Sequence, residues 1–225
     1  ILKNKKCLNF IISKSGNTLE TIVNVNIHTS NKDKNILITE NRDNVLRTIA
    51  LKLKSEVIDH NNFIGGRYSV LSEVGMLPAE LMGLSEKKFK QLNNLIKNKF
   101  FFNSIISNVT NILELIKKRK TNSVILNYDE SFDNFLKWYQ QLTAESIGKK
   151  GKGIFPIIST MPKDNHSLMQ LYLDGKQNNF YTFFYTNDGI TQKIKKKALI
   201  NSQNFLNNKS LNDVLISQIL ATKNV

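Results

Sequence analysis

Two segments of the chain alternate short apolar runs with amphipathic stretches, and this alternation limits the possible folds more than any other feature. In the first segment, apolar runs at residues 7–12, 35–39 and 57–58 alternate with helix-like stretches at residues 19–27 and 43–56. In the second, apolar runs lie at residues 123–128, 154–159 and 180–185, and an amphipathic helix begins near Phe132. Strands that alternate with helices are typical of parallel sheets. We therefore predict an α/β fold with parallel strands.

The stretch between these two segments has a helical pattern. Apolar residues recur there at helical spacing, from Phe89 to Ile96 and again from Ile105 to Ile116. A basic run, Lys-Lys-Arg-Lys at residues 117–120, follows directly. We predict a domain boundary at this run, which gives a first part at residues 1–120 and a second at residues 121–225.

The chain is strongly basic, with 32 Lys and Arg against 18 Asp and Glu and a net charge of +14. Nucleic acid, an anionic membrane surface and anionic metabolites are the usual partners of such a charge. Arg, whose planar fork reads phosphate best, occurs only at Arg42, Arg47, Arg67 and Arg119. A solvated lysine surface without a partner is the alternative interpretation. A nucleic-acid binder would show steeply salt-dependent affinity, and no nucleic-acid motif supports one.

Cysteine content and apolar run length restrict the class further. Cys7 is the single cysteine, which excludes an intrachain disulfide and a cysteine-based metal site and favours a reducing cytoplasm. The apolar runs are far shorter than the roughly 20 residues that a membrane span needs. We expect a cytoplasmic α/β protein that has no membrane partner.

Residues 13–18 (Ser-Lys-Ser-Gly-Asn-Thr) follow a predicted strand and precede a predicted helix. Free backbone N–H groups and the helix dipole make such a turn an anion site, and its hydroxyls add donors suited to a phosphate monoester. Asn17 and Glu20 have the spacing of a capping box, so an ordinary capped turn is the alternative.

A second candidate is the Gly65-Gly66-Arg67 string. Adjacent glycines let the backbone approach a ligand or adopt a positive φ. An arginine directly after them would be a permanent cation able to stabilise a developing oxyanion. A tight turn with a surface arginine explains the string equally well.

Two further residues could exchange protons with a substrate. Glu145 falls at the flank of the apolar stripe of its predicted helix, and Gln141, four residues earlier, would share its side. His166 is one of three histidines and titrates near neutrality. The alternatives are a solvated helix-end glutamate and a packing histidine.

Together these strings resemble the phosphoglucose isomerase family, in the same order and over nearly the whole chain. Residues 13–21 resemble its Ser-Lys-Ser/Thr phosphate loop, and residues 63–69 resemble its Gly-Gly-Arg-Phe/Tyr-Ser signature. Residues 141–149, with Gln141 and Glu145, match its catalytic glutamate segment. The family's Gln-His becomes Asn165-His166.

The resemblance implies three-layer α/β/α sugar-isomerase (SIS, flavodoxin-like) domains, two in a full-length chain. It implies interconversion of glucose 6-phosphate and fructose 6-phosphate in glycolysis and gluconeogenesis, without metal or organic cofactor. Glu145 would move the proton through a cis-enediol, Arg67 would stabilise its charge, and His166 would assist ring opening from across a homodimer interface. The implied substrate and phosphate ligands are Ser13, Lys14, Ser15, Thr18, Thr21, Gly66 and Gln141.

The chain departs from the family pattern at both ends. The family's Gly-Gly-Ser loop has no counterpart before Cys7, and its Gly-x-Glu-x-x-Lys segment has none after Ser202. We therefore expect residues 1–120 to hold the C-terminal part of one SIS domain and a helical connection, and residues 121–225 to hold a second SIS domain that is incomplete at its C-terminal end. A fragment and a split or degenerate protein are the open alternatives, as is a non-catalytic SIS module that senses sugar phosphates.

Overall fold

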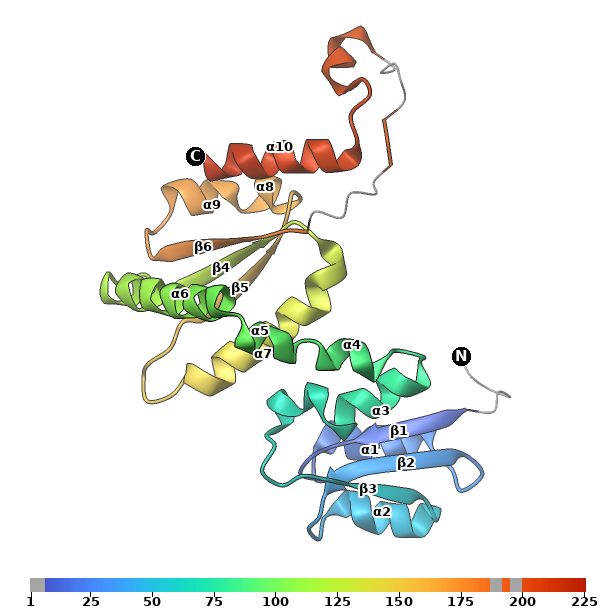
Figure 1. The fold of residues 1–225 in the computed structure, drawn as a ribbon. Coiled ribbons are helices and arrows are strands. Elements are labelled where there is room, and N and C mark those ends of the chain that lie inside the picture. Colours follow the sequence, from blue (N-terminus) through green and yellow to red (C-terminus); the bar gives the residue numbers. More distant parts are fainter. Residues whose placement is uncertain (1–6, 187–191, 195–199) are drawn as a thin grey trace. The chain divides into compact units, whose positions relative to one another are not determined.

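The computed structural model describes residues 7–186, 192–194 and 200–225, so the first six residues of the predicted first domain and two stretches of the second lie outside the described residues. The chain divides into two compact units between Phe102 and Asn103. Figure 1 shows the elements of each unit. The assignment of residues 1–120 and 121–225 to two SIS domains stays a prediction.

The first unit is built on a three-stranded parallel sheet in the order β1-β2-β3. A helix connects each strand to the next, as the alternating sequence pattern predicts. The elements are β1 (Leu8–Ile12), α1 (Leu19–His28), β2 (Lys34–Glu40), α2 (Val45–Leu53) and β3 (Glu56–His60).

Strand register places one apolar row of this sheet under both helices. Ile11, Leu37 and Val57 are paired across the three strands, and α1 and α2 contribute Val25 and Leu46 to the same core. Ile38 follows Leu37 and points to the opposite face, yet it too is fully buried. Both faces of the sheet are therefore covered, and the carboxyl ends of its strands lie at one edge.

Short helices follow the sheet of the first unit, and a long one joins the two units. Their bounds are η1 (Gly66–Leu71), α3 (Glu73–Leu81), α4 (Glu86–Lys90), α5 (Asn93–Lys97) and α6 (Lys99–Lys117). The helical pattern predicted between residues 89 and 116 is thereby confirmed.

The second unit has its own three-stranded parallel sheet in the order β5-β4-β6. Its strands are β4 (Asn122–Asn127), β5 (Phe155–Thr160) and β6 (Asn179–Phe184). Its helices are η2 (Glu130–Phe132), α7 (Asp133–Ile147), α8 (Asp164–Ser167), α9 (Met169–Asp174), η3 (Asn201–Leu206) and α10 (Leu211–Lys223).

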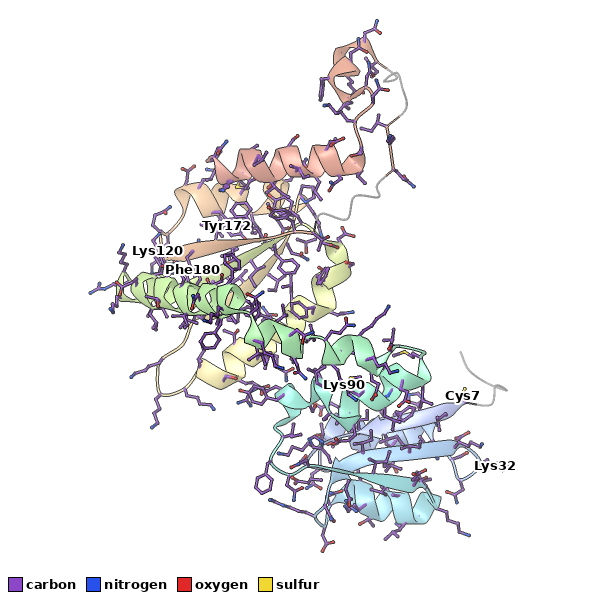
Figure 2. The ribbon with its side chains drawn as sticks, viewed as in Figure 1. Cys7, Lys32, Lys90, Lys120, Tyr172 and Phe180 are labelled. Atoms are coloured by element: carbon purple, nitrogen blue, oxygen red, sulfur yellow. The ribbon has the colours of Figure 1, made fainter. Side chains whose placement is uncertain are left out.

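Helices cover both faces of this sheet (Figure 1). On one face, Val124 and Leu126 pack with Tyr172 of α9 and Ile219 of α10. Tyr172 lies between α9 and the sheet in Figure 2, and its ring packs edge-on against that of Tyr181 of β6, with ring centres 5.5 Å apart. On the other face, α7 packs along β5, and Gln140 Nε2 donates to the Pro156 carbonyl at 2.7 Å. The predicted α/β class with parallel strands and flanking helices is confirmed.

Among the helices that the structure describes, none combines the length and apolar character needed to cross a bilayer.

Candidate functional site

The hydroxyl-rich turn at residues 13–18 lies where β1 ends and α1 begins, as predicted. Ser13 is buried, and its Oγ lies 2.8 Å from Thr18 Oγ1, so the two hydroxyls share a hydrogen bond. Ser15 is exposed, and its Oγ accepts from the Asn17 N–H. Thr21 follows in the first turn of α1, where the leading N–H groups have no partner within the helix. The turn thus gathers three hydroxyl groups next to the unpaired N–H groups of a helix N-terminus.

Gly16 allows this turn to close against the start of α2. Its φ is +66°, a left-handed conformation that favours glycine, and a Cβ there would lie 2.0 Å from Asn44 Oδ1. Asn44 caps α2 by accepting from the Arg47 N–H. Close packing against Asn44, in addition to the positive φ, therefore requires glycine at this position.

The predicted capping box at the start of α1 is wrong. The N-cap is Thr18, which makes no side-chain capping bond, because its hydroxyl is engaged with Ser13. Asn17 Oδ1 instead accepts from the Val45 N–H at the start of α2. Capping therefore does not account for these hydroxyls, which favours the interpretation of the turn as an anion site.

Lys14 connects this turn to the loop that carries the two glycines. Its Nζ donates to the Asn62 carbonyl at 3.0 Å, and its own carbonyl accepts from Thr39 Oγ1 and the Glu40 N–H. Residues 13–18 and residues 61–67 therefore lie together at the carboxyl edge of the first sheet. The family resemblance implies a role for Lys14 in phosphate binding, and the sequence carries no signal for this link.

Gly65 and Gly66 do not use positive φ, so that alternative is wrong. Gly65 has a φ of −65° and Gly66 begins the 3₁₀ helix η1, while a Cβ on Gly66 would meet nothing within 4 Å. Ser69 is buried and its Oγ donates to the Gly66 carbonyl at 2.6 Å. The Arg67 guanidinium lies 4.7 Å from the centre of the Tyr68 ring. The backbone at Gly66 thus has open space beside it, and the next residue carries the guanidinium that contacts the Tyr68 ring.

Glu145 and Gln141 lie on one side of α7, as their spacing predicts. Gln141 Nε2 donates to Glu145 Oε1 at 2.9 Å, and both side chains are exposed. A cavity of 640 Å³ opens beside this end of the helix, lined in part by Gln140, Ala144 and Gly148. The Glu145 carboxylate thus accepts a hydrogen bond from Gln141 and lies at the exposed surface of α7.

His166 is exposed on α8, a single turn that follows β5. Asp164 holds this turn: its carboxylate accepts from Ser159 Oγ, the Thr160 N–H and Ser167 Oγ at 2.8–2.9 Å. Burial raises the pKa of Asp164, but these three hydrogen bonds and the charge of Lys163 lower it below its ordinary 3.8. The carboxylate therefore remains ionised and fixes the backbone of α8, the turn that carries His166.

Glu145 and His166 lie beside opposite ends of the strands of the second sheet. Glu145 is near the end of α7, next to the loop that leads into β5, whereas His166 follows the end of β5. The six residues of β5 separate these ends, which at roughly 3.3 Å per residue is about 20 Å. One copy of this unit therefore does not bring the two side chains together.

Within the described residues, no three His, Cys, Asp or Glu side chains gather closely enough to hold a metal ion.

A family model described as phosphoglucose isomerase matches residues 2–221 of the chain. The chain is 36% identical to a glucose-6-phosphate isomerase of Methanocaldococcus jannaschii over 77% of its own length and 46% of that protein. It is 31% identical to a probable glucose-6-phosphate isomerase of Methanococcus maripaludis, over 98% of the chain and 52% of that protein. The chain thus spans about half the length of the curated relatives it matches.

Among solved structures, a hypothetical protein from Thermus thermophilus superimposes with a TM-score of 0.78 and is 23% identical in sequence. The match covers 96% of this chain and 56% of the other. It supports the α/β fold described above.

Proposed function

The chain belongs to the phosphoglucose isomerase family, and from this premise we propose that its protein interconverts glucose 6-phosphate and fructose 6-phosphate as an enzyme of glycolysis and gluconeogenesis. The observation that carries the proposal is the turn at residues 13–18, where the Thr18 hydroxyl hydrogen-bonds to Ser13 and does not cap α1. We also propose that residues 1–120 and 121–225 contribute to two SIS domains, and that the protein acts in the cytoplasm.

The phosphate binds to the turn at residues 13–18, in this proposal. Ser13, Ser15 and Thr18 supply hydroxyls, with Thr21 and the Lys14 backbone close by. The phosphate is remote from the reacting carbons, so its binding energy orients the sugar for reaction.

Proton transfer needs a base beside the sugar carbons and a cation near the oxygen that gains charge. Glu145 removes the proton from C2 of open-chain glucose 6-phosphate and returns it to C1, through a cis-enediol intermediate. Arg67 stabilises the negative charge on that intermediate, and Gln141 holds the substrate and the carboxylate. No step calls for a metal or an organic cofactor.

His166 assists opening of the sugar ring and comes from a second copy of the chain. The separation of Glu145 and His166 across the sheet supports this arrangement, because a site with both side chains then requires two copies. The proposal therefore includes a homodimer.

A coupled assay for fructose 6-phosphate formation tests the reaction directly. The full-length protein should convert glucose 6-phosphate, and binding of the sugar phosphate without turnover would favour the non-catalytic sensor instead.

We expect Gly66→Ala to weaken substrate binding without loss of stability. The added methyl group meets no protein atom within 4 Å, so unfolding free energy should stay constant or rise by up to about 0.5–1 kcal/mol. The methyl group would, however, project into the space of the substrate, so KM should rise roughly tenfold, equivalent to about 1.4 kcal/mol.

Gly83→Ala is the matched control, because Gly83 also has open space around it but a φ of +81°. Strain there should reduce stability by about 1 kcal/mol and leave KM unchanged. Urea denaturation and steady-state kinetics distinguish the two. An unchanged KM in Gly66→Ala would remove Gly66 from the binding site.

Asp164→Asn should reduce stability at neutral pH, since the charged acceptor of three hydrogen bonds is lost. We expect a loss of about 1–3 kcal/mol. Because folding lowers the pKa of Asp164, its carboxylate stabilises the folded state above about pH 4, and this contribution disappears as the pH falls further. Urea denaturation of wild type and variant should therefore converge in acid. Asp43→Asn, at an exposed residue, serves as the control, and a pH-independent difference would contradict the assignment.

A further inference from the structure

His60 is a buried titratable group that the proposed mechanism does not use. It is the last residue of β3, and only 1% of its surface is exposed. Its position is the carboxyl edge of the first sheet, where residues 13–18 and 61–67 also lie. A histidine buried at this position needs hydrogen-bond partners for its two ring nitrogens.

Both ring nitrogens of His60 contact hydrogen-bond acceptors. Nε2 lies 3.1 Å from the Ile64 carbonyl oxygen, and Nδ1 contacts the Glu73 carboxylate in the first turn of α3. A carbonyl oxygen can only accept, so Nε2 carries a proton. Nδ1 and the Glu73 carboxylate share a second hydrogen bond, so both nitrogens of the buried ring are engaged.

Glu73 is held in its ionised form. Burial raises the pKa of its carboxyl group, but hydrogen bonds from His60 and from the backbone N–H groups of Glu73 and Asn61, with the positive charge of His60, lower it below its ordinary 4.5. The two side chains therefore form a charge-assisted pair, partly screened because the Glu73 side chain is 28% exposed.

We propose that His60 and Glu73 are positioning residues that hold the segment at residues 61–72, and with it Gly66 and Arg67, in its binding geometry. The pair joins the residue that precedes this segment to the residue that follows it, and so closes the segment into a loop. The bond from Nε2 to Ile64 fixes the residue directly before Gly65. Lys14 holds the same segment from the other side, through Asn62.

This inference rests on the proposed function, in which Arg67 stabilises the intermediate. A group that stabilises transition-state charge must be placed accurately, and a shift of about 1 Å can cost about 10²-fold in rate. Loss of the pair should therefore affect kcat more than KM, because the phosphate turn at residues 13–18 keeps its own contacts.

The test uses variants of the full-length protein that differ in which bonds they retain. His60→Leu removes both bonds, and Glu73→Ala removes the partner of Nδ1. Glu73→Gln is the conservative variant, because its amide N–H can donate to an unprotonated Nδ1 while Nε2 still donates to Ile64. Glu80→Ala, at an exposed residue of the same helix, is the control.

We expect His60→Leu and Glu73→Ala to lower kcat by roughly 10- to 100-fold and to speed hydrogen exchange at residues 61–72. Glu73→Gln should retain most of the rate and protection, and Glu80→Ala all of it. If His60→Leu does not fold, the Glu73 variants decide, since that side chain is partly exposed. Unchanged exchange at residues 61–72 in Glu73→Ala would overturn the proposal. Full activity in Arg67→Ala would instead refute the role of Arg67, and the exchange result would still measure the positioning.

Discussion

Replacement of Glu145 by glutamine is expected to abolish most of the isomerase activity while leaving sugar-phosphate binding nearly intact. The amide has the same shape as the carboxylate, and its oxygen can still accept the hydrogen bond from Gln141. It cannot, however, take a proton from C2. Positioned acid–base catalysis typically contributes 10²–10⁴-fold, so we expect kcat to fall by about that factor or more.

Steady-state kinetics give kcat, and calorimetric titration with fructose 6-phosphate gives the affinity. Glu130→Gln is the matched control, because it makes the same chemical change at an exposed residue of the same unit. It should leave both quantities unchanged. A Glu145→Gln variant with wild-type turnover would end the assignment of Glu145 as the base, and a joint loss of binding and structure would point to a packing role.

Local patterns in the sequence predicted the elements that build the site. Each of the six strands that the structure describes lies within a residue or two of its apolar run, because buried strands of a parallel sheet need continuous apolar residues. The pairing of Gln141 with Glu145 followed from helical spacing alone. These features depend on near neighbours in the chain, which a single sequence displays.

Contacts between segments could not be predicted in this way. Asn17 and Glu20 had the spacing of a capping box, but Asn17 bonds to α2 because the turn packs against that helix. The bond from Lys14 to Asn62 joins two loops that are distant in sequence. The ring contacts of His60 likewise depend on how α3 returns to the sheet edge. Such partners are set by tertiary packing, for which local spacing carries no signal.

A mixture of two inactive variants is expected to recover activity if the site is shared between two copies. Glu145→Gln lacks the base and His166→Gln lacks the ring-opening histidine, so each homodimer has two defective sites. In a mixed dimer, one site combines both changes, and the other combines the intact Glu145 of one copy with the intact His166 of the other. Random assortment makes about half of the dimers mixed, so recovery should reach about a quarter of wild-type activity.

The positions of Glu145 and His166 in the second unit mean that recovery of activity would require two copies of the chain. Glu145 and His166 are separated by the length of β5, so a single copy cannot supply both to one substrate unless the sheet itself is rebuilt. The mixture should be denatured and refolded together, and the activity compared with that of the separately refolded variants. A mixture of Glu145→Gln with Arg67→Ala tests whether Arg67 comes from the same copy as the base. If so, its mixed dimers have one defect in each site and gain nothing. Absence of recovery with His166→Gln, in a sample shown to contain mixed dimers, would mean that His166 serves the site of its own chain or none.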